Sequence, residues 1–246
     1  MRYFLEVAYK STNYSGFQSQ KNANTIQAEV QKAFKTILKK ELELTGSSRT
    51  DAGVHAYQNY FHFDLESDLS SQLVYNLNAI LPTDIAIKQL LKVKDNAHCR
   101  FDAVSREYKY HIYQKKNPFL TDKAFYFPYT LDIEAMQEAA VILREYSDFT
   151  SFSKRNTQVK SFVCDIKESR WVVQDQCLTY NVKANRFLRG MVRALTATML
   201  NLGRRKIDLS TFRRIIETKD CTLASFSAPA HGLFLTEVCF PDNYFI

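Results

Sequence analysis

The sequence predicts an α/β protein. Segments in which apolar and polar residues alternate, the pattern of a half-buried strand, occur at residues 2–9, 61–65 and 105–113. Between them lie segments with apolar residues three or four positions apart, the pattern of an amphipathic helix. The hydrophobic fraction of 46% and the charged fraction of 24% are those of a soluble globular protein. A chain of 246 residues is long enough for one large domain or two of ordinary size.

The first part of the chain is expected to alternate between strands and helices. The first strand, at residues 2–9, is expected to be buried on one face only, the face of Tyr3, Leu5, Val7 and Tyr9. Asn24 or Thr25 can cap a helix that runs to about Lys40. The buried stripe of this helix is expected to be Ile26, Val30, Phe34, Ile37 and Leu38. A second helix is expected at 70–81, with Leu73, Leu77 and Ile80 as its buried stripe. The strand with Phe61, Phe63 and Leu65 is expected to place His62 on its solvent side, and residues 84–93 form a further candidate strand.

A loose boundary near residues 104–115 is expected to divide the chain into lobes at 1–104 and 105–246. The strand at 105–113 places Tyr108, Tyr110 and Ile112 on one face. Residues 115–128 contain Asn-Pro and Phe-Pro pairs and are expected to be an irregular connection. The remaining expected elements are a helix at 132–146, a hairpin of 162–173 and 178–182 with Trp171 as a packing residue, a helix at 208–218 and a final strand after residue 228.

Charge and cysteine usage narrow the possible partners and compartments. The net charge of +7 and pI of about 9.1 favour a polyanionic partner, because counterion release drives such binding. The five cysteines are scattered and lack Cys-x-x-Cys spacing, which indicates free thiols in a reducing cytoplasm and no metal site. The six glycines form no dinucleotide or P-loop motif, so no cofactor is expected. No apolar run is long enough to span a bilayer and no secretory signal is visible, so we expect a cytoplasmic protein without a membrane partner.

The most informative stretch runs from Gly46 to Ala56 and reads GSSRTDAGVHA. It joins an arginine, a threonine, a carboxylate and a histidine within a few residues, and it has too few apolar side chains to build a core. We expect a loop between rigid elements, where site residues tend to lie. From the spacing alone, the favoured interpretation is a tight turn over Asp51-Ala52-Gly53 in which Asp51 bonds its own backbone.

Residues 184–193, reading ANRFLRGMVR, are expected to open a helix that continues to Leu202, with Gly203 as its C-cap. Its buried stripe is expected to be Leu188, Met191, Val192, Leu195, Met199 and Leu202. Arg186, Arg189 and Arg193 would then fall at positions i, i+3 and i+7 and share one helix face. An arginine stripe of this kind is usually a solvated face. The basic run 204–206 suits contact with phosphates and equally suits a plain surface.

Separated segments across almost the whole chain resemble the TruA-type tRNA pseudouridine synthase family, in the family's order. Residues 49–56, RTDAGVHA, resemble the family's signature, and residues 184–193 resemble its third motif. The supporting segments are 14–20, where Phe17 replaces the usual tryptophan, 106–110, 148–152 and 228–235. The resemblance implies the pseudouridine synthase fold, an α/β (α+β) protein of two lobes, each a mixed or antiparallel sheet flanked by helices, with a basic central cleft.

The resemblance also implies the reaction, an isomerisation of uridine to pseudouridine that uses no cofactor and no metal. Asp51 would be the nucleophile, Arg193 its ion-pair partner and Tyr108 the ring that stacks on the target base. A carboxylate in a water-poor cleft needs such an opposite charge to stay ionised. Arg49 would help to hold the flipped nucleotide, and Arg189 would line the RNA cleft.

The implied assembly is a homodimer in which one tRNA contacts both subunits, with uridines 38–40 of the anticodon stem-loop as targets. The sequence departs from the family pattern at Ser47-Ser48, where a glycine is lost, and at Arg189-Gly190, where a bulky pair is common. These departures leave open a non-catalytic tRNA-binding or folding module, or the same chemistry on other RNA uridines. An aspartate hydrolase is disfavoured, because Asp51 lies in neither an Asp-Thr-Gly nor an Asp-x-Asp motif.

Overall fold

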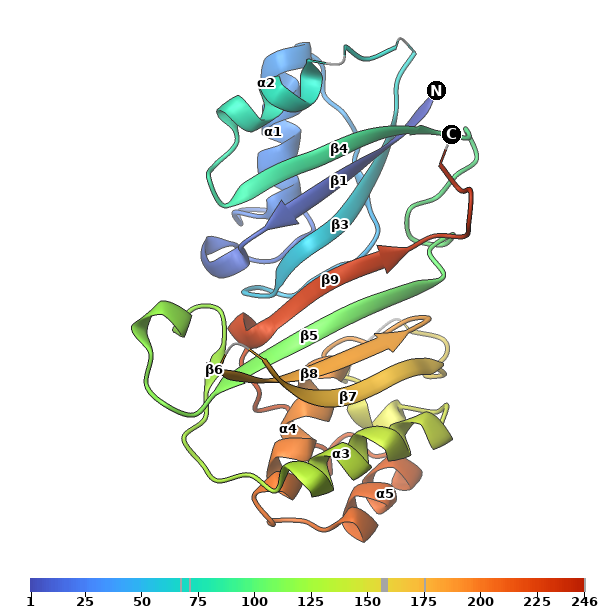
Figure 1. Cartoon of the computed structure of the whole chain (residues 1–246). Helices are drawn as coiled ribbons and strands as arrows, with labels where there is room; N and C mark the ends of the chain where they lie inside the picture. The colour runs from blue at the N-terminus through green and yellow to red at the C-terminus, as the bar shows by residue number, and fades with distance from the viewer. Residues whose placement is uncertain (67, 71, 156–158, 175, 246) are drawn as a thin grey trace. The chain divides into compact units, whose positions relative to one another are not determined.

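The computed structural model describes residues 1–66, 68–70, 72–155, 159–174 and 176–245, and the chain divides into two compact units (Figure 1). Unit 1 is Met1–Val104 together with the segment that begins at Phe234, and unit 2 is Ser105–Leu233. The expected division assigned everything after residue 104 to the second lobe. The segment from Phe234 onward lies with unit 1 because its strand pairs with the sheet of that unit.

Unit 1 is built on a mixed sheet with the strand order β4-β1-β3-β9. β1 (Arg2–Tyr9) lies between β4 (Ile85–Val93) and β3 (His55–Asp64) and is antiparallel to both. β9 (Leu233–Cys239) is parallel to β3, and the short β2 (Thr45–Gly46) is antiparallel to it. The three strands expected in this part of the chain are therefore confirmed.

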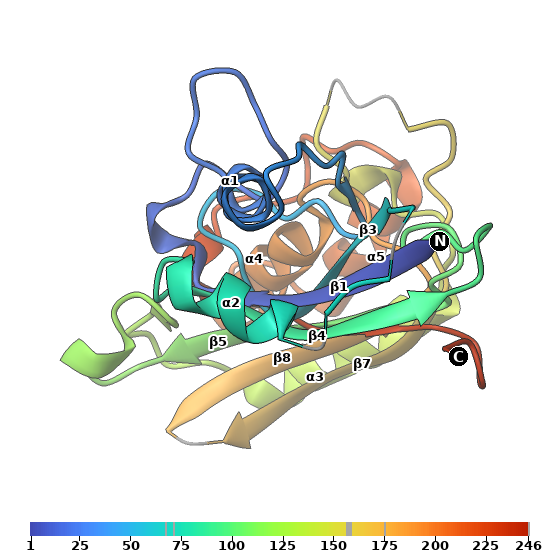
Figure 2. The ribbon, with the colours of Figure 1, turned by 90° about the horizontal axis from the view of Figure 1, so that it is seen from above.

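Two helices pack against this sheet. α1 (Ile26–Leu38) lies on one side of it (Figure 2), begins at the predicted cap Thr25, and packs the ring of Phe34 against that of Phe63 at 5.1 Å. The short η1 (Ser11–Asn13) precedes it. α2 (Leu73–Ile80) is joined to β4 by Asn78, whose side chain makes two hydrogen bonds of 2.8 Å with the backbone of Ile87. Ile80 is 47% exposed, so its predicted place in the buried stripe is wrong: it is the last residue of the helix, beyond the packed turns.

The first strand is buried on both faces, whereas its alternation predicts burial on one. Leu5 is buried as expected, but Phe4 is buried as completely and Glu6 is only 9% exposed. The ring of Phe4 packs against those of Phe240 at 5.4 Å and Tyr244 at 5.9 Å. This cover comes from the far end of the chain, so the local pattern of the strand could not reveal it.

His62 lies on the same covered face, and its predicted position on the solvent side is wrong. The residue is 6% exposed; its Nδ1 lies 3.2 Å from Cys99 Sγ and its ring lies 4.5 Å from that of His98. Burial, followed by repulsion from His98, lowers the pKa of His62 to about 4. His62 is therefore a neutral core residue at pH 7.

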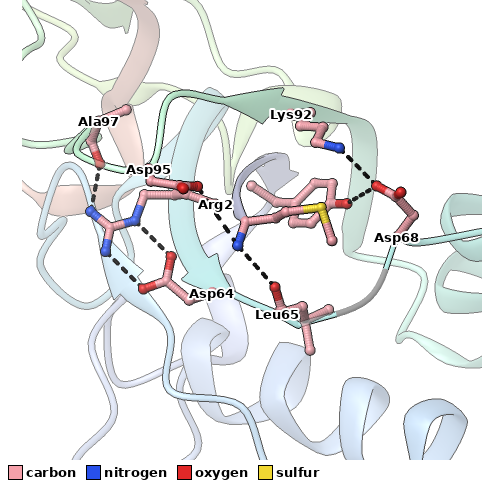
Figure 3. A network of polar contacts seen from close by, with 9 residues as sticks. Arg2, Asp64, Leu65, Asp68, Lys92, Asp95 and Ala97 are labelled. Carbon is pink, nitrogen blue, oxygen red and sulfur yellow. Dashed lines mark hydrogen bonds and ion pairs between the residues drawn. The ribbon is translucent and has the colours of Figure 1, made fainter.

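Polar contacts fasten the N-terminus to unit 1 (Figure 3). The guanidinium of Arg2 donates two hydrogen bonds of 2.8 and 2.7 Å to the carboxylate of Asp64 and a third, of 2.8 Å, to the carbonyl of Ala97. The α-amino group donates to Leu65 O at 3.1 Å and lies 3.7 Å from Asp95. The remaining contacts in Figure 3 join Asp68 to Lys92 and Tyr3. Paired, two-bond geometry makes the Arg2 contact stronger than an ordinary surface ion pair.

Unit 2 is built on an antiparallel sheet with the order β5-β8-β7, formed by β5 (Ser105–Tyr113), β8 (Cys177–Ala184) and β7 (Ile166–Gln174). The short β6 (Phe125–Tyr126) runs parallel to β5. The predicted hairpin is confirmed as β7 and β8; the turn residue at position 175 lies outside the described residues. Trp171 is a packing residue as predicted, with its ring 5.0 Å from that of Tyr180. The sheets of the two units confirm the predicted α/β class of mixed and antiparallel sheets with flanking helices.

Helix α3 (Ile133–Ile142) protects the edge strand of unit 2. Its Gln137 Oε1 accepts a hydrogen bond of 2.8 Å from the backbone N–H of Trp171 in β7. An edge strand with an N–H group satisfied in this way, and with a helix beside it, is a poorer template for pairing with another chain. Four short 3-10 helices, η2 (Pro118–Leu120), η3 (Leu143–Glu145), η4 (Thr150–Phe152) and η5 (Ala230–Gly232), lie in the described connections of this unit.

Helix α4 (Met191–Gly203) forms the core of unit 2, and α5 (Leu209–Thr218) packs against α3 and α4. Leu195 and Met199 are fully buried, as predicted. The prediction that Gly203 caps the helix is wrong: Gly203 is the last helical residue, and a Cβ there would overlap the side chain of Met136 in α3. Gly203 is therefore required by helix packing. None of the described helices has both the length and the hydrophobicity that a membrane crossing requires.

Candidate functional site

The Asp51 loop of unit 1 contains the turn that its spacing favours. The carbonyl oxygen of Asp51 accepts a hydrogen bond of 3.1 Å from the N–H of Val54. Gly53 has a φ of 77°, a left-handed conformation that glycine adopts without strain. Asp51 is half-buried at the start of this turn, and Arg49 is exposed. The turn thus presents the carboxylate just before the first residue of β3, on a backbone of defined shape.

The buried side-chain amide of Asn59 supports this loop through hydrogen bonds. The side chain of Asn59 donates to Ser48 O at 2.8 Å and to Tyr9 Oη at 3.0 Å, and it accepts hydrogen bonds from the N–H groups of Ser48 at 3.2 Å and Tyr60 at 2.9 Å. The Tyr9 hydroxyl in turn lies 2.8 Å from Thr50 Oγ1. Fully satisfied buried networks of this kind rigidify the groups they join. Sequence reasoning missed Asn59, although an asparagine in the middle of a buried strand is a signal that could have found it.

A second loop lies directly against the Asp51 loop. The N–H of Phe17 donates to Thr50 O at 3.1 Å. Gly16, at a φ of 103°, approaches so closely that a Cβ there would lie 3.2 Å from Thr50 O. Phe17 stacks on Phe61 with their ring centroids 4.5 Å apart, and a side chain at Gly46 would overlap its ring. Phenylalanine therefore serves as the apolar support of the loop without needing an indole donor.

The departure at Ser47-Ser48 is accommodated through the backbone. Ser47 N–H donates to Tyr60 O at 2.8 Å. The backbone N–H and the backbone carbonyl of Ser48 are both hydrogen-bonded to the side chain of Asn59. Both serines are less than 9% exposed. Their hydroxyls make no hydrogen bond to any residue that the structure describes. Hydrogen bonds to Asn59 and Tyr60 of β3 therefore hold the backbone of both serines in place.

His55, also part of the Asp51 loop motif, is a structural residue. It is 1% exposed, its Nδ1 accepts a hydrogen bond of 2.9 Å from the N–H of Ser11, and its ring packs on Phe234 at 4.6 Å. Because Nδ1 is an acceptor, the neutral ring carries its proton on Nε2. His55 therefore joins the loop to β9 and η1.

In unit 2, Tyr108 lies at the middle of β5, opposite Val182 of β8. Its ring is half-buried and meets that of Phe187 edge-on, with centroids 5.1 Å apart. Phe187 belongs to the segment that joins β8 to α4. An aromatic neighbour at this angle fixes the plane of the tyrosine ring. The sequence marked Tyr108 but did not identify Phe187 as its support.

Arg193 lies in the first turn of α4 and is half-buried. Its Nε donates a hydrogen bond of 2.7 Å to the carbonyl of Ala228. The neighbouring carbonyl of Pro229 accepts one of 2.8 Å from the hydroxyl of Tyr110, a residue whose pKa is raised by burial. Residues 228–232 therefore hold an arginine of the helix and a tyrosine of the sheet in place, a role that their sequence did not disclose.

Arg189 does not share a helix face with Arg193, and that prediction is wrong. The helix begins at Met191, so Arg186 lies in the irregular segment before it and Arg189 lies in the turn that leads into the helix. Gly190 forms the N-cap with a φ of 76°, and a Cβ there would lie 3.1 Å from the side chain of Lys154. The carbonyl of Arg189 accepts a hydrogen bond of 3.0 Å from the N–H of Lys154, and its side chain is exposed. A glycine adopts the left-handed conformation at position 190 without strain.

The predicted site residues fall into two groups. Asp51 and Arg49 belong to unit 1, whereas Tyr108, Arg189 and Arg193 belong to unit 2. Within unit 2, the β8–α4 segment brings the support of Tyr108 and the anchored Arg193 onto one short stretch of chain. The pairing of Asp51 with Arg193 stays a prediction. In the described part of the chain, no three His, Cys, Asp or Glu side chains are grouped closely enough to hold a metal ion.

Comparison with known proteins identifies the family. A family model described as tRNA pseudouridine synthase matches residues 7–102 and 139–241, which include Asp51 and Arg193. A protein named tRNA pseudouridine synthase A from Azobacteroides pseudotrichonymphae is 44% identical over 245 residues, with 99% of this chain and 98% of the relative covered. A protein of the same name from Porphyromonas gingivalis is 43% identical, with 100% of this chain and 99% of the relative covered. One from Staphylococcus aureus is 37% identical, with 99% of this chain and 92% of the relative covered. The chain therefore belongs to the tRNA pseudouridine synthase family and is an isomerase.

Proposed function

We propose that this chain converts uridine to pseudouridine at positions 38–40 of the tRNA anticodon stem-loop, with Asp51 as the nucleophile. The observation that carries this proposal is the Asp51 turn, which a buried amide and a second loop support on both sides. An enzyme needs its nucleophile held in one geometry before the substrate arrives. The names of the full-length relatives support tRNA as the substrate.

The reaction requires no external reagent. The bond between N1 of uracil and C1′ of the ribose breaks, a bond between C5 and C1′ forms, C5 loses its proton and N1 gains one. The carboxylate of Asp51 would form a covalent intermediate with the sugar or the base and would be released again when the product forms. The balance of atoms and electrons leaves no role for a redox cofactor in these steps.

The other predicted residues would position the nucleotide. Arg193 would pair with Asp51 and orient its carboxylate. The hydrogen bond from Arg193 to Ala228 orients the guanidinium. Tyr108 would stack on the extruded uracil, since Phe187 already fixes the plane of its ring. Arg49 and Arg189, both exposed, would contact the flipped nucleotide and the RNA backbone.

The assembly and compartment are part of the same proposal. We propose a homodimer in which one tRNA contacts both subunits, in the cytoplasm, where tRNA is available. The net charge of +7 supports binding to this polyanion.

Release of tritium from tRNA labelled at C5 of uridine tests the proposal, because the label leaves only when C5 becomes the glycosidic carbon. We expect release by the wild type, none by Asp51→Ala, and full release by the matched control Asp242→Ala, which changes an exposed aspartate near the C-terminus. Full activity of Asp51→Ala would refute this nucleophile. Binding of tRNA without any release by the wild type would favour a non-catalytic module. Mapping of the modified positions distinguishes uridines 38–40 from other RNA uridines.

A further inference from the structure

A stripe of aromatic rings begins in β6 of unit 2 and continues just after it. It lies outside the residues proposed to act on the uridine. The ring centroids of Phe125 and Phe127 lie 5.2 Å apart, and those of Phe127 and Tyr129 lie 4.9 Å apart. The backbone of the stripe is fixed, because Phe127 N–H donates to Tyr113 O at 2.9 Å and the side chain of Gln114 donates to Tyr129 O at 2.5 Å. Tyr129 is 45% exposed. The stripe therefore presents a flat ring to solvent from an ordered backbone.

Arg204 completes the stripe. Its guanidinium carbon lies 3.7 Å from the centroid of Tyr129 and 6.0 Å from that of Phe127. The backbone N–H of Arg204 donates a hydrogen bond of 3.0 Å to Leu200 O, so the end of α4 fixes the position of this residue. A guanidinium stacked on a ring keeps its N–H groups free at the edge, in a planar fork that suits a phosphate. No carboxylate among the described residues pairs with Arg204, whereas its neighbour Arg205 pairs with Asp132 at 3.0 Å.

Four exposed lysines lie close to the rings and to Arg204 in the sequence. Lys115 and Lys116 follow Gln114 directly, Lys123 precedes Phe125 by two positions, and Lys206 follows the arginines. In the part of the chain that the structure describes, none of these four ammonium groups forms an ion pair with a carboxylate. Residues 115–129 contain one acidic residue, Asp122. Lysines therefore outnumber acidic residues on this segment.

We propose that these rings and cations form a second RNA-binding surface, the basic aromatic surface, made by Phe125, Phe127, Tyr129, Arg204 and the lysines 115, 116, 123 and 206. It would contact tRNA away from the reacting uridine, with phosphates on the cations and an exposed base or ribose face on Tyr129. The inference rests on the proposed function for the identity of the RNA. Aromatic faces interleaved with cations are the features that bind nucleic-acid strands. The cores of interfaces between protein copies are, by contrast, depleted in lysine.

Binding of unmodified tRNA at several salt concentrations tests this surface with three variants and two matched controls. We expect Arg204→Ala to weaken the tRNA Kd by about fivefold or more and to lower the slope of log Kd against log salt by about one, because one phosphate contact is lost. Tyr129→Ala should weaken Kd by about tenfold with the slope unchanged, because stacking carries no charge. Arg204→Lys should keep the slope and lose part of the affinity.

The controls separate recognition from general effects. Tyr129→Phe keeps the ring, and Arg214→Ala removes an exposed arginine of α5; both should bind within about twofold of the wild type. The rate of tritium release at saturating tRNA should be unchanged in every variant, since the surface lies outside the proposed catalytic set.

Two results would overturn the inference. One is an unchanged tRNA Kd in the folded double variant of Arg204→Ala and Tyr129→Ala. The other is a change from dimer to monomer in light scattering with unchanged tRNA affinity, which would assign the surface to a second copy of the chain. If the wild type binds tRNA with the expected dependence on these residues but releases no tritium, the proposed function fails and the binding surface stands.

Discussion

The Asp51 loop and the segment that leads to Arg193 would supply the two halves of one ion pair, yet they are held in different ways. The loop is a local turn supported by the buried side chain of Asn59, which makes four hydrogen bonds around it. The segment is held by hydrogen bonds to backbone carbonyls, from the N–H of Lys154 to the carbonyl of Arg189 and from the Nε of Arg193 to the carbonyl of Ala228. The turn at Asp51 was therefore predictable from its own residues, although its support was not, whereas the segment before Arg193 takes its shape from parts of the chain far away in sequence.

The largest effect is expected at Arg193. Arg193→Ala should lower the single-turnover rate of tritium release more than about 100-fold, because the nucleophile would lose the charged partner that orients its carboxylate. Arg193→Lys should recover part of the rate, since it restores the charge without the fork. The matched variant Arg189→Ala, in the turn before the helix, should raise KM with little change in the maximal rate.

Equal losses of rate in the variants of Arg189 and Arg193 would remove the distinction between the helix residue and the segment before it. A wild-type rate in Arg193→Ala would contradict its assignment as the partner of Asp51.

A smaller effect is expected from the support of the loop. Asn59→Ala leaves buried backbone groups of Ser48 without partners and should lower the free energy of unfolding by about 3 kcal/mol, measured by urea titration. It should also lower the rate of tritium release, because the loop loses its fixed shape. Asn78→Ala is the matched control: it removes a side-chain amide with two hydrogen bonds to the backbone of Ile87 in the same unit.

Asn78→Ala should lower the stability of unit 1 and leave the rate at saturating tRNA unchanged. If both asparagine variants changed the rate to the same extent, the support of the loop would be a matter of general stability.

The smallest effects separate two of the glycines with a positive φ, Gly16 and Gly190. Gly16→Ala and Gly190→Ala should each lower the free energy of unfolding by about 1 kcal/mol, because both residues have a positive φ. At Gly16 the added Cβ meets the backbone of Thr50, so the Asp51 loop must shift and the rate should fall about tenfold. At Gly190 it meets the flexible side chain of Lys154, which can move aside.

Thermal unfolding and single-turnover kinetics on the two glycine variants measure these quantities. A greater loss of rate in Gly190→Ala than in Gly16→Ala would show that the segment before α4, and not the loop, is the more sensitive half of the site.

Local patterns predicted most of the elements, and they failed where remote segments intervened. The Thr25 cap, the hairpin of β7 and β8 and the buried stripe of α4 follow from neighbouring residues alone. The burial of Phe4 and His62 does not, because the cover comes from the C-terminal aromatic residues and from the segment around His98. Arg189 was wrongly placed on the helix because apolar spacing continues through Leu188 and hides the turn at Gly190.

The family, the Asp51 turn and the order of strands and helices could be predicted from the amino-acid sequence, because turn chemistry and periodicity act over a few residues. The support of the loop by Asn59, of Tyr108 by Phe187 and of Arg193 by Ala228 became visible in the folded chain. Each of these contacts joins residues from different elements. Their partners are selected by how those elements pack in three dimensions, which no local pattern of the chain records.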